Sequence, residues 1–349
     1  MKIDDILKGC PQNPTIMKSI ITTYTKINDP TYKKILCSIS GGSDSDILVD
    51  LCTRCDISKK VDYVFFDTGI EYSATKRHLD YLEQKYDIHI ERERAKKSVA
   101  YSCKHYGQPF LSKYVSTMCG RLQKHGFTWE DRPFKELYRE YPNCKAALLW
   151  WCNENGENSK FNISRNKYLK EFMIQNPPNF LISANCCNTS KKNLVHSILK
   201  QGNYDLNITG VRKAEGGIRS VAYKSCFDSR FGEYDNYRPI FWYKDIDKET
   251  YVKSFNVQNS DCYTIYGLKR TGCCGCPFGR NVSYELEIVK KYEPKLNNAI
   301  LNIFKDSYVY TKKFEEFKKE KKTEDYIQKS ALYRFLNYPK DDNFKDDKI

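Results

Sequence analysis

Short apolar runs of strand length alternate along the chain with stretches in which apolar residues recur at helical spacing. The runs at 35–39, 61–66 and 88–90 predict strands, and the second is dense in β-branched and aromatic residues. After the first run, Ile47 and Leu51 lie one helical turn apart, as on the buried side of a helix. This alternation predicts an α/β fold: a parallel twisted sheet with right-handed crossovers and helices on both faces.

The strength of this periodicity divides the chain into four parts. Residues 1–30 predict a helical preface, which ends at Asp29-Pro30 because proline disfavours helical backbone in the residue before it. Residues 31–280 hold the alternating strands and helices. From about 96 to 180 the pattern weakens over a stretch too long for one connection, which predicts a helical insert. Residues 281–349 are charged and predict a helical C-terminal region.

The loop Ser40-Gly41-Gly42-Ser43-Asp44-Ser45 joins the first strand to the helix that follows it. Its glycines let backbone N–H groups close on an oxyanion, the helix start adds a positive dipole, and the serines add hydroxyl donors. Asp44 would repel a phosphate, so we expect it to help hold Mg²⁺ beside the phosphates. The loop lacks Gly-Lys-Ser/Thr and is not a Walker A loop. An ordinary turn that binds nothing remains the alternative.

Two further strand ends carry residues suited to a nucleotide. Ligands of parallel sheets bind at the carboxyl ends of the strands, where Asp67 can position Mg²⁺ or a ribose. Arginines at such an end can form paired hydrogen bonds with phosphate or sulfate. A helix cap at Asp67 and solvated surface arginines remain the alternatives. The candidate residues at these two ends are Asp67, Thr68, Gly69, Gly210, Arg212 and Arg219.

The chain contains 15 cysteines. Without an apolar leader, this number predicts reduced thiols that pack in the core, bind metal or do chemistry, rather than a disulfide scaffold. Two groups stand out, Cys186-Cys187 and Cys273-x-x-Cys276, and four thiolates suffice for a [4Fe–4S] cluster. Adjacent cysteines are unusual at a structural zinc site. Zinc and metal-free buried thiols stay open, and so does Cys274, which could replace a ligand or act chemically.

These motifs together resemble one enzyme family. Ser-Gly-Gly-x-Asp-Ser after a strand resembles the PP-loop of the ATP pyrophosphatase superfamily, the adenine nucleotide alpha-hydrolase-like enzymes. Phe-Asp-Thr-Gly-Ile-Glu at 66–71 and Gly-Val-Arg-x-x-Glu at 210–215 resemble signatures of its PAPS reductase branch. The paired cysteines resemble the cluster motif of adenylyl-sulfate reductases and of the sulfurtransferases of DNA phosphorothioation. These signatures span about residues 35–280, and the chain is identified as a member of the PAPS reductase family.

The resemblance implies a chemistry and its cofactors. ATP or a related adenine nucleotide would bind the 40–45 loop with Mg²⁺, with Asp44 and Arg212 in catalytic roles. A [4Fe–4S] cluster would lie on Cys186, Cys187, Cys273 and Cys276. A substrate oxygen would be adenylated with loss of pyrophosphate, and sulfur would then displace AMP.

Two other functions stay open at this point. Sulfonucleotide reductases carry a nucleophilic cysteine in a C-terminal Glu-Cys-Gly-type segment, whereas no cysteine follows Cys276 here. We therefore expect adenylation and sulfur transfer ahead of a PAPS or adenylyl-sulfate reductase. A non-catalytic nucleotide sensor with a structural metal is the third hypothesis. The absence of pyrophosphate release would distinguish such a sensor from the adenylating enzyme.

The formal net charge is +14. This charge suits anionic partners such as nucleotides, nucleic acid or sulfate esters, although genomic base bias can produce the same composition. With the resemblance, it favours DNA or tRNA as the acceptor and a separate sulfur-donor protein as a partner. Because the sequence has neither a long apolar run nor an apolar leader, we expect a cytoplasmic protein with no membrane partner.

Overall fold

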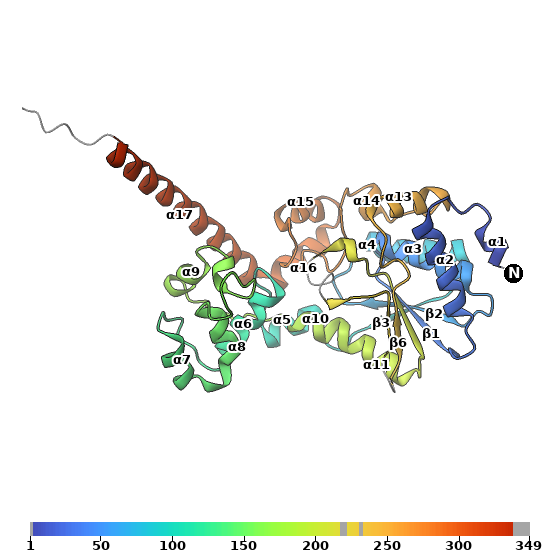
Figure 1. Ribbon diagram of the computed structural model, residues 1–349, viewed down its shortest axis with the longest axis horizontal. Helices are drawn as coiled ribbons and strands as arrows, with labels where there is room; N and C mark the ends of the chain where they lie inside the picture. The colour runs from blue at the N-terminus through green and yellow to red at the C-terminus, as the bar shows by residue number, and fades with distance from the viewer. Residues whose placement is uncertain (1–2, 217–221, 230–232, 338–349) are drawn as a thin grey trace, which may run out of the picture. The chain divides into compact units, whose positions relative to one another are not determined.

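The computed structural model describes residues 3–216, 222–229 and 233–337 (Figure 1). The chain forms two compact units, and each unit is discontinuous in sequence. Unit 1 comprises Met1–Tyr106 and Asn185–Ile303, and unit 2 comprises Gly107–Ala184 and Phe304–Ile349.

Unit 1 contains a six-stranded sheet with the order β3-β2-β1-β4-β6-β5. The first five strands in this order run parallel, and the short edge strand β5 is antiparallel to β6. The strands are β1 (Ile35–Ile39), β2 (Val61–Asp67), β3 (Ile90–Arg94), β4 (Leu206–Thr209), β5 (Phe227–Asp228) and β6 (Asp235–Tyr237). The α/β class and the parallel sheet predicted from the sequence are confirmed.

The helices of unit 1 connect and cover these strands. They are α1 (Ile3–Leu7), α2 (Pro14–Ile27), α3 (Ser43–Cys55), α4 (Ser73–Tyr86), α5 (Val99–Tyr106), α10 (Asn185–Cys187), α11 (Asn193–Gln201), α13 (Asp245–Ser254), α14 (Asp261–Thr264), α15 (Val282–Tyr292) and α16 (Pro294–Ile303). A π-helical segment, Asn188–Lys192, joins α10 to α11.

Alternating side chains of the central strands pack against two layers of helices. Cys37 of β1 belongs to a large core that includes residues of α2, α3, α4 and α13. Its neighbour Leu36 faces the other way and packs in a smaller core with Leu199 of α11. Figure 1 shows α3, α4 and α13 on one side of the strands and α11 on the other. The helices therefore cover both faces, as predicted.

The third strand begins later than the run at 88–90 predicts. Asp87 after α4 adopts the left-handed conformation, with φ 49°, and Ile88 N–H still donates to Glu83 O at 3.3 Å. Ile88 thus belongs to the turn that ends α4, and pairing with β2 starts at Ile90. The apolar pattern predicted the strand correctly but placed its first residue too early.

The order of the strands determines where a ligand site can form. From β1 the chain moves outward through β2 to β3, and it later builds β4 on the other side of β1. The loops that leave β1 and β4 therefore diverge at the carboxyl edge of the sheet, where open α/β sheets bind ligands. The 40–45 loop and the segment from Gly210 to Arg212 leave the sheet at this edge.

Unit 2 is helical and has an aromatic core that includes the fully buried Trp150 and Trp151. Gln108 N–H donates to Leu181 O at 2.7 Å, which joins the two ends of the segment 107–184. The helices are α6 (Lys113–Lys124), α7 (Phe134–Glu140), α8 (Lys145–Trp151), α9 (Leu169–Gln175) and α17 (Lys305–Asn337). Unit 2 thus combines residues of the predicted insert with α17 of the C-terminal region, while α15 and α16 belong to unit 1.

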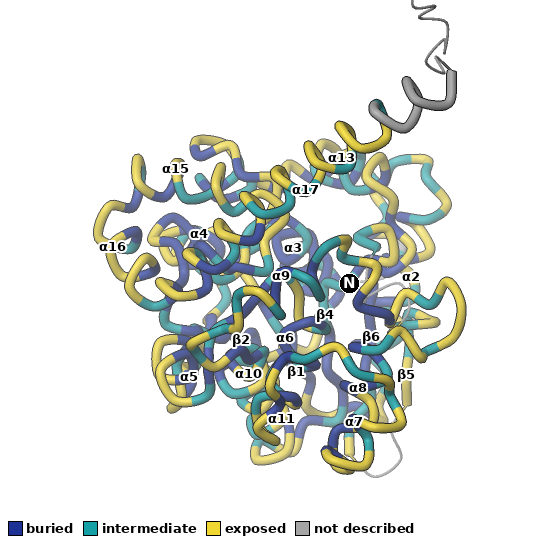
Figure 2. Tube along the Cα trace, turned by 90° about the vertical axis from the view of Figure 1, so that its left-hand side faces the viewer, coloured by how far each residue is buried: buried dark blue, intermediate teal, exposed yellow. Residues whose placement is uncertain are grey.

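The central strands are more deeply buried than the outer turns of the helices. In Figure 2, β1 and β2 are largely buried, whereas the helices alternate between buried and exposed turns. Within the described ranges, no helix is both long enough and apolar enough to cross a bilayer.

Candidate functional site

The 40–45 loop forms a tight turn at the carboxyl end of β1. Gly41 has φ +65°, and a Cβ atom there would lie 2.4 Å from Cγ2 of Thr75 on α4. Both the backbone conformation and the space therefore require glycine. Ser40 N–H donates to the buried Ser45 Oγ at 3.0 Å, which holds the turn closed over the start of α3.

The start of α3 gathers backbone amides and hydroxyl groups at one point. Gly42 is the N-cap residue, and Ser43 N–H donates to the Tyr263 hydroxyl at 3.1 Å. Tyr263 also shares a hydrogen bond of 3.0 Å with Thr271 Oγ1. A Cβ atom at Gly42 would lie 3.2 Å and 3.0 Å from these two hydroxyl oxygens. We call this group of donors, with the 40–45 loop, the cradle; its composition suits an oxyanion.

Asp44 lies between two cations at the edge of the cradle. Its Oδ1 atom is 3.0 Å from Arg212 Nε and 2.8 Å from Lys248 Nζ. Arg212 is almost fully buried and also pairs with Asp245 at 2.9 Å. Burial alone would lower the pKa of Arg212, but the carboxylates of Asp44 and Asp245 raise it above its ordinary value. In this arrangement Asp44 neutralises cations that could otherwise face a phosphate.

Lys248 of α13 is a functional candidate that sequence reasoning missed. Its Nζ atom donates to Ser43 Oγ at 2.5 Å, and so it lies beside the first turn of α3 as well as beside Asp44. The two residues are 205 positions apart, and Lys248 lies in no recognisable motif. Its contact is created by the packing of α13 on α3, which no local pattern reveals.

The ends of β4 and β2 place the other predicted residues. A Cβ atom at Gly210 would lie 3.3 Å from the carbonyl oxygen of Asp44, so Gly210 borders the cradle. Asp67 accepts from Gly69 N–H at 2.8 Å and pairs with Lys76 at 3.1 Å, which is the arrangement of a turn cap. Arg219 lies outside the described residues.

Behind the cradle, a buried carboxylate ties α3 to α4. Asp46 Oδ1 and His78 Nε2 are 2.9 Å apart, and both side chains are nearly inaccessible to solvent. Burial raises the pKa of Asp46, although the hydrogen bond with His78 opposes the rise. Within the described residues, Asp46 Oδ2 has no hydrogen-bond partner. This pair supports the first turn of α3 from within the core.

Cys186 and Cys187 form the start of a helix that continues through the π-helical segment into α11. π-helical turns often occur at functional sites. Thr189 Oγ1 lies 2.5 Å from Ser102 Oγ, which anchors this helix start against α5. The cysteines are therefore held on regular structure.

The loop 273–279 brings two more thiols to the same region. The hydrogen bond with Cys103 is the largest cause that raises the pKa of the Cys186 thiol, and the nearby Cys276 adds to the rise. Cys187 adds to the effect of burial on the pKa values of both Cys273 and Cys276. Burial is the largest cause for the loop thiols and brings the pKa of Cys273 to about 11 and that of Cys276 to about 12. As they stand, the described side chains contain no group of three or more Cys, His, Asp or Glu residues that could hold a metal ion.

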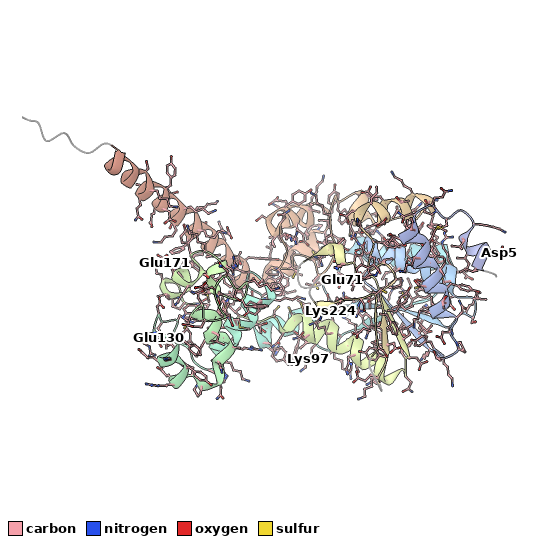
Figure 3. The ribbon with its side chains drawn as sticks, viewed as in Figure 1. Asp5, Glu71, Lys97, Glu130, Glu171 and Lys224 are labelled. Carbon is pink, nitrogen blue, oxygen red and sulfur yellow. The ribbon has the colours of Figure 1, made fainter. Side chains whose placement is uncertain are left out.

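The end of β2 borders this thiol region. Thr68 Oγ1 lies 3.5 Å from Cys273 Sγ and donates to Glu71 Oε1 at 2.7 Å. Glu71 is buried and is labelled in Figure 3. Burial raises the pKa of Glu71, and the nearby Lys191 opposes that rise. Thr68, which the sequence associated with the nucleotide, therefore also contacts Cys273.

Two other cysteines take different positions. Cys274 is fully buried, its thiol hydrogen-bonds with Tyr72, and its N–H donates to Ile70 O at 2.9 Å. Cys103 of α5 is also buried, and its hydrogen bond with Cys186 raises the pKa of the Cys186 thiol. The structure therefore places Cys103 beside the predicted ligands, whereas Cys274 serves the packing of its own loop.

The phosphoadenosine phosphosulfate reductase domain model matches residues 34–278. The chain belongs to this family. The matched range includes the cradle loop and all four predicted ligand cysteines. Among curated proteins, the uncharacterized protein MJ0066 of Methanocaldococcus jannaschii is 23% identical over 287 residues, which are 82% of this chain and 44% of that protein. The chain therefore spans less than half the length of this relative.

Solved structures of low identity also match this member of the PAPS reductase family. The phosphate complex of PAPS reductase from Candida auris is 13% identical, with a TM-score of 0.40, and the match covers 78% of this chain and 93% of that one. The U34-tRNA thiolase NcsA from Methanococcus maripaludis, with its [4Fe–4S] cluster, is 10% identical, with a TM-score of 0.36 and coverages of 86% and 80%.

The PAPS reductase family chain thus holds two groups of reactive side chains within unit 1. One is the cradle with Arg212 and Lys248, which offers amide, hydroxyl and cationic donors to an anion. The other is the thiol group on the helix start at 186–187 and the loop 273–276. The segment from Tyr263 to Cys273 contacts both groups.

Proposed function

We propose that this chain is an ATP-dependent enzyme of the PAPS reductase family that adenylates an acceptor and then transfers sulfur to it. The acceptor oxygen attacks the α-phosphorus of ATP, and the bond from that phosphorus to the bridging oxygen breaks to release pyrophosphate. A sulfur nucleophile then attacks the adenylated carbon, and AMP leaves with the acceptor oxygen. DNA or tRNA is the acceptor class that we favour, with a separate protein as the sulfur donor.

The observation that carries this proposal is the cradle at the start of α3, joined by one short segment to the thiol group. The amide of Ser43, the Arg212 guanidinium and the Lys248 ammonium can together bind the phosphates of ATP. Arg212 and Lys248 both pair with Asp44. We propose that they turn to phosphate oxygens when ATP binds, which frees the Asp44 carboxylate.

Two cofactors belong to the proposal. Asp44 would hold Mg²⁺, which neutralises charge on the phosphates. Cys186, Cys187, Cys273 and Cys276 would hold a [4Fe–4S] cluster, which would bind or activate the transferred sulfur. Four reduced thiols from two segments that meet in one region fit such a group in number and type. The hydroxyl oxygen of Thr68 lies 3.5 Å from one of these sulfurs, that of Cys273.

Reduction of a sulfonucleotide is the alternative that the family match favours. A reductase needs a thiol that attacks the sulfonucleotide, and Cys274 is the spare thiol of the 273–276 loop. Burial raises the pKa of the Cys274 thiol, and this rise outweighs the opposing hydrogen bond with Tyr72, so little of the nucleophilic thiolate forms. We therefore expect PAPS and a thioredoxin-type reductant to give little sulfite, and ATP to give pyrophosphate at a rate that rises with the correct acceptor.

One assay with two readouts, sulfite and pyrophosphate, checks this expectation on the wild type and on Cys274→Ser. Both proteins should release pyrophosphate from ATP at similar rates. Rapid sulfite production by the wild type that is lost in Cys274→Ser would restore the reductase function. A protein that binds ATP and releases neither product, with DNA or tRNA present, would favour a nucleotide sensor.

Lys248 gives a second test of the cradle. Lys248→Met removes an ammonium group from the first turn of α3, and we expect the Kd for ATP to rise about tenfold to a hundredfold, the usual loss for one charge-assisted hydrogen bond. Lys253→Met is the matched control, because Lys253 lies exposed on the same helix and carries the same charge. Calorimetric titration that gives equal affinities for the two variants would remove Lys248 from the site.

A further inference from the structure

The Tyr263 hydroxyl takes a hydrogen bond that a bound anion would need. In the cradle, Ser43 N–H donates to this hydroxyl at 3.1 Å. The amide belongs to the first turn of α3, whose N–H groups have no partner within the helix. An oxyanion seated at the helix start would accept from the same amide. The phenol and the anion therefore compete for one donor.

Tyr263 is also joined to the loop that carries the thiols. Its hydroxyl lies 3.0 Å from Thr271 Oγ1, and Thr271 is two residues before Cys273. Beyond that point the loop is fixed to the end of β2, since Cys273 Sγ lies 3.5 Å from Thr68 Oγ1 and Cys274 N–H donates to Ile70 O at 2.9 Å. One end of the 271–276 segment thus rests on the cradle and the other on β2.

The absence of a side chain at Gly42 makes this contact possible. A Cβ atom at Gly42 would lie 3.0 Å from Thr271 Oγ1 and 3.2 Å from the Tyr263 hydroxyl, both tighter than ordinary contact. The two hydroxyl groups therefore occupy the space directly above the N-cap of α3. An anion that enters this space must move them.

We infer that Tyr263 is a positioning residue that couples anion binding in the cradle to the thiol loop. When a phosphate group binds, it accepts the hydrogen bond from Ser43 N–H in place of the Tyr263 hydroxyl. The hydroxyl then turns away, and the hydrogen bond between Tyr263 and Thr271 is lost. The 271–276 segment then keeps its bonds to the end of β2 and the bond of 3.1 Å from Gly275 N–H to Glu285 Oε1 of α15, and its Thr271 end opens more often. A single hydrogen bond changes such an equilibrium by a factor of about five. This inference rests on the proposed function, because it takes the cradle as the phosphate site.

Hydrogen–deuterium exchange of the 349-residue chain, followed by mass spectrometry, tests the coupling. The peptide over 271–279 is compared with and without sodium pyrophosphate, whose binding is measured by calorimetry on the same sample. In the wild type, we expect pyrophosphate to speed exchange of this peptide about fivefold. Tyr263→Phe should exchange at the faster rate without pyrophosphate and respond no further. It should also bind pyrophosphate several-fold more tightly, because no hydroxyl has to leave the amide.

Tyr326→Phe is the matched control, since Tyr326 is 74% exposed on α17, and it should behave as the wild type does. Pyrophosphate that binds the wild type without changing exchange over 271–279 would overturn the coupling and leave the cradle intact. A Tyr263→Phe protein whose loop exchanges at the wild-type rate would overturn it as well. If the wild type fails to bind pyrophosphate, the cradle itself is wrong, and the coupling is wrong with it.

Discussion

Gly42→Val is expected to weaken ATP binding at least a hundredfold, which corresponds to about 2.7 kcal/mol or more. A Cβ atom at this position would already lie 3.0 Å from Thr271 Oγ1 and 3.2 Å from the Tyr263 hydroxyl, and valine adds two methyl groups to it. These methyl groups would fill the space above the Ser43 amide, where a phosphate oxygen has to enter. Calorimetric titration with ATP and Mg²⁺ measures the loss.

The fold should tolerate this substitution, because the atoms that must yield are the ends of two side chains that are partly exposed. Circular dichroism and the iron content of the variant check this point, and both should match the wild type. A folded Gly42→Val protein that binds ATP with wild-type affinity would show that the nucleotide does not occupy the start of α3.

Cys186→Ser is expected to remove most of the iron and acid-labile sulfide from protein purified without oxygen. The reason is that Cys186 lies at the centre of the thiol group, in contact with Cys103 and Cys187 and near Cys276. A [4Fe–4S] cluster needs four thiolate ligands, so a serine at this position should lower iron and sulfide together. Metal analysis, sulfide analysis and the visible absorption spectrum measure the effect.

Cys274→Ser provides the matched control, because Cys274 belongs to the same loop but is bonded to Tyr72. We expect it to keep its iron and sulfide. Stoichiometric zinc in the wild type, with no iron, would contradict the cluster. If Cys186→Ser keeps its iron and Cys103→Ser loses it, then Cys103, and not Cys186, is the cluster ligand.

The fold was largely predictable because its signals are local. The alternation of strand and helix from 35 to 90 reflects which side chains of each element face the core, and burial of Cys37 on one side and Leu36 on the other follows that pattern. The start of the third strand was misplaced because a left-handed Asp87 prolongs the preceding turn. The packing of Tyr310 of α17 in the core of unit 2 was not predictable, since nothing local pairs distant helices.

The candidate site was also predictable only where its signals are local. The 40–45 loop and the paired cysteines could be selected from the sequence because each is a short motif whose residue types fit one chemistry. Lys248 and Tyr263 could not, since they reach Ser43 from 205 and 220 positions away and lie in no motif. The contact of the Thr68 hydroxyl with Cys273 was not foreseen either, and the predicted contact of Thr68 with the nucleotide stays a prediction. Contacts between distant segments depend on packing, which residue spacing does not encode.

Cleavage between the α- and β-phosphates of ATP is the central claim, and the products of ATP turnover test it most directly. Protein purified without oxygen is incubated with ATP and Mg²⁺, with and without DNA or tRNA, and the nucleotides and phosphates are separated by ion-exchange chromatography. The account predicts AMP and pyrophosphate in equal amounts, both reduced in Asp44→Asn by more than ATP affinity is reduced. Formation of ADP and inorganic phosphate by the wild type would contradict it.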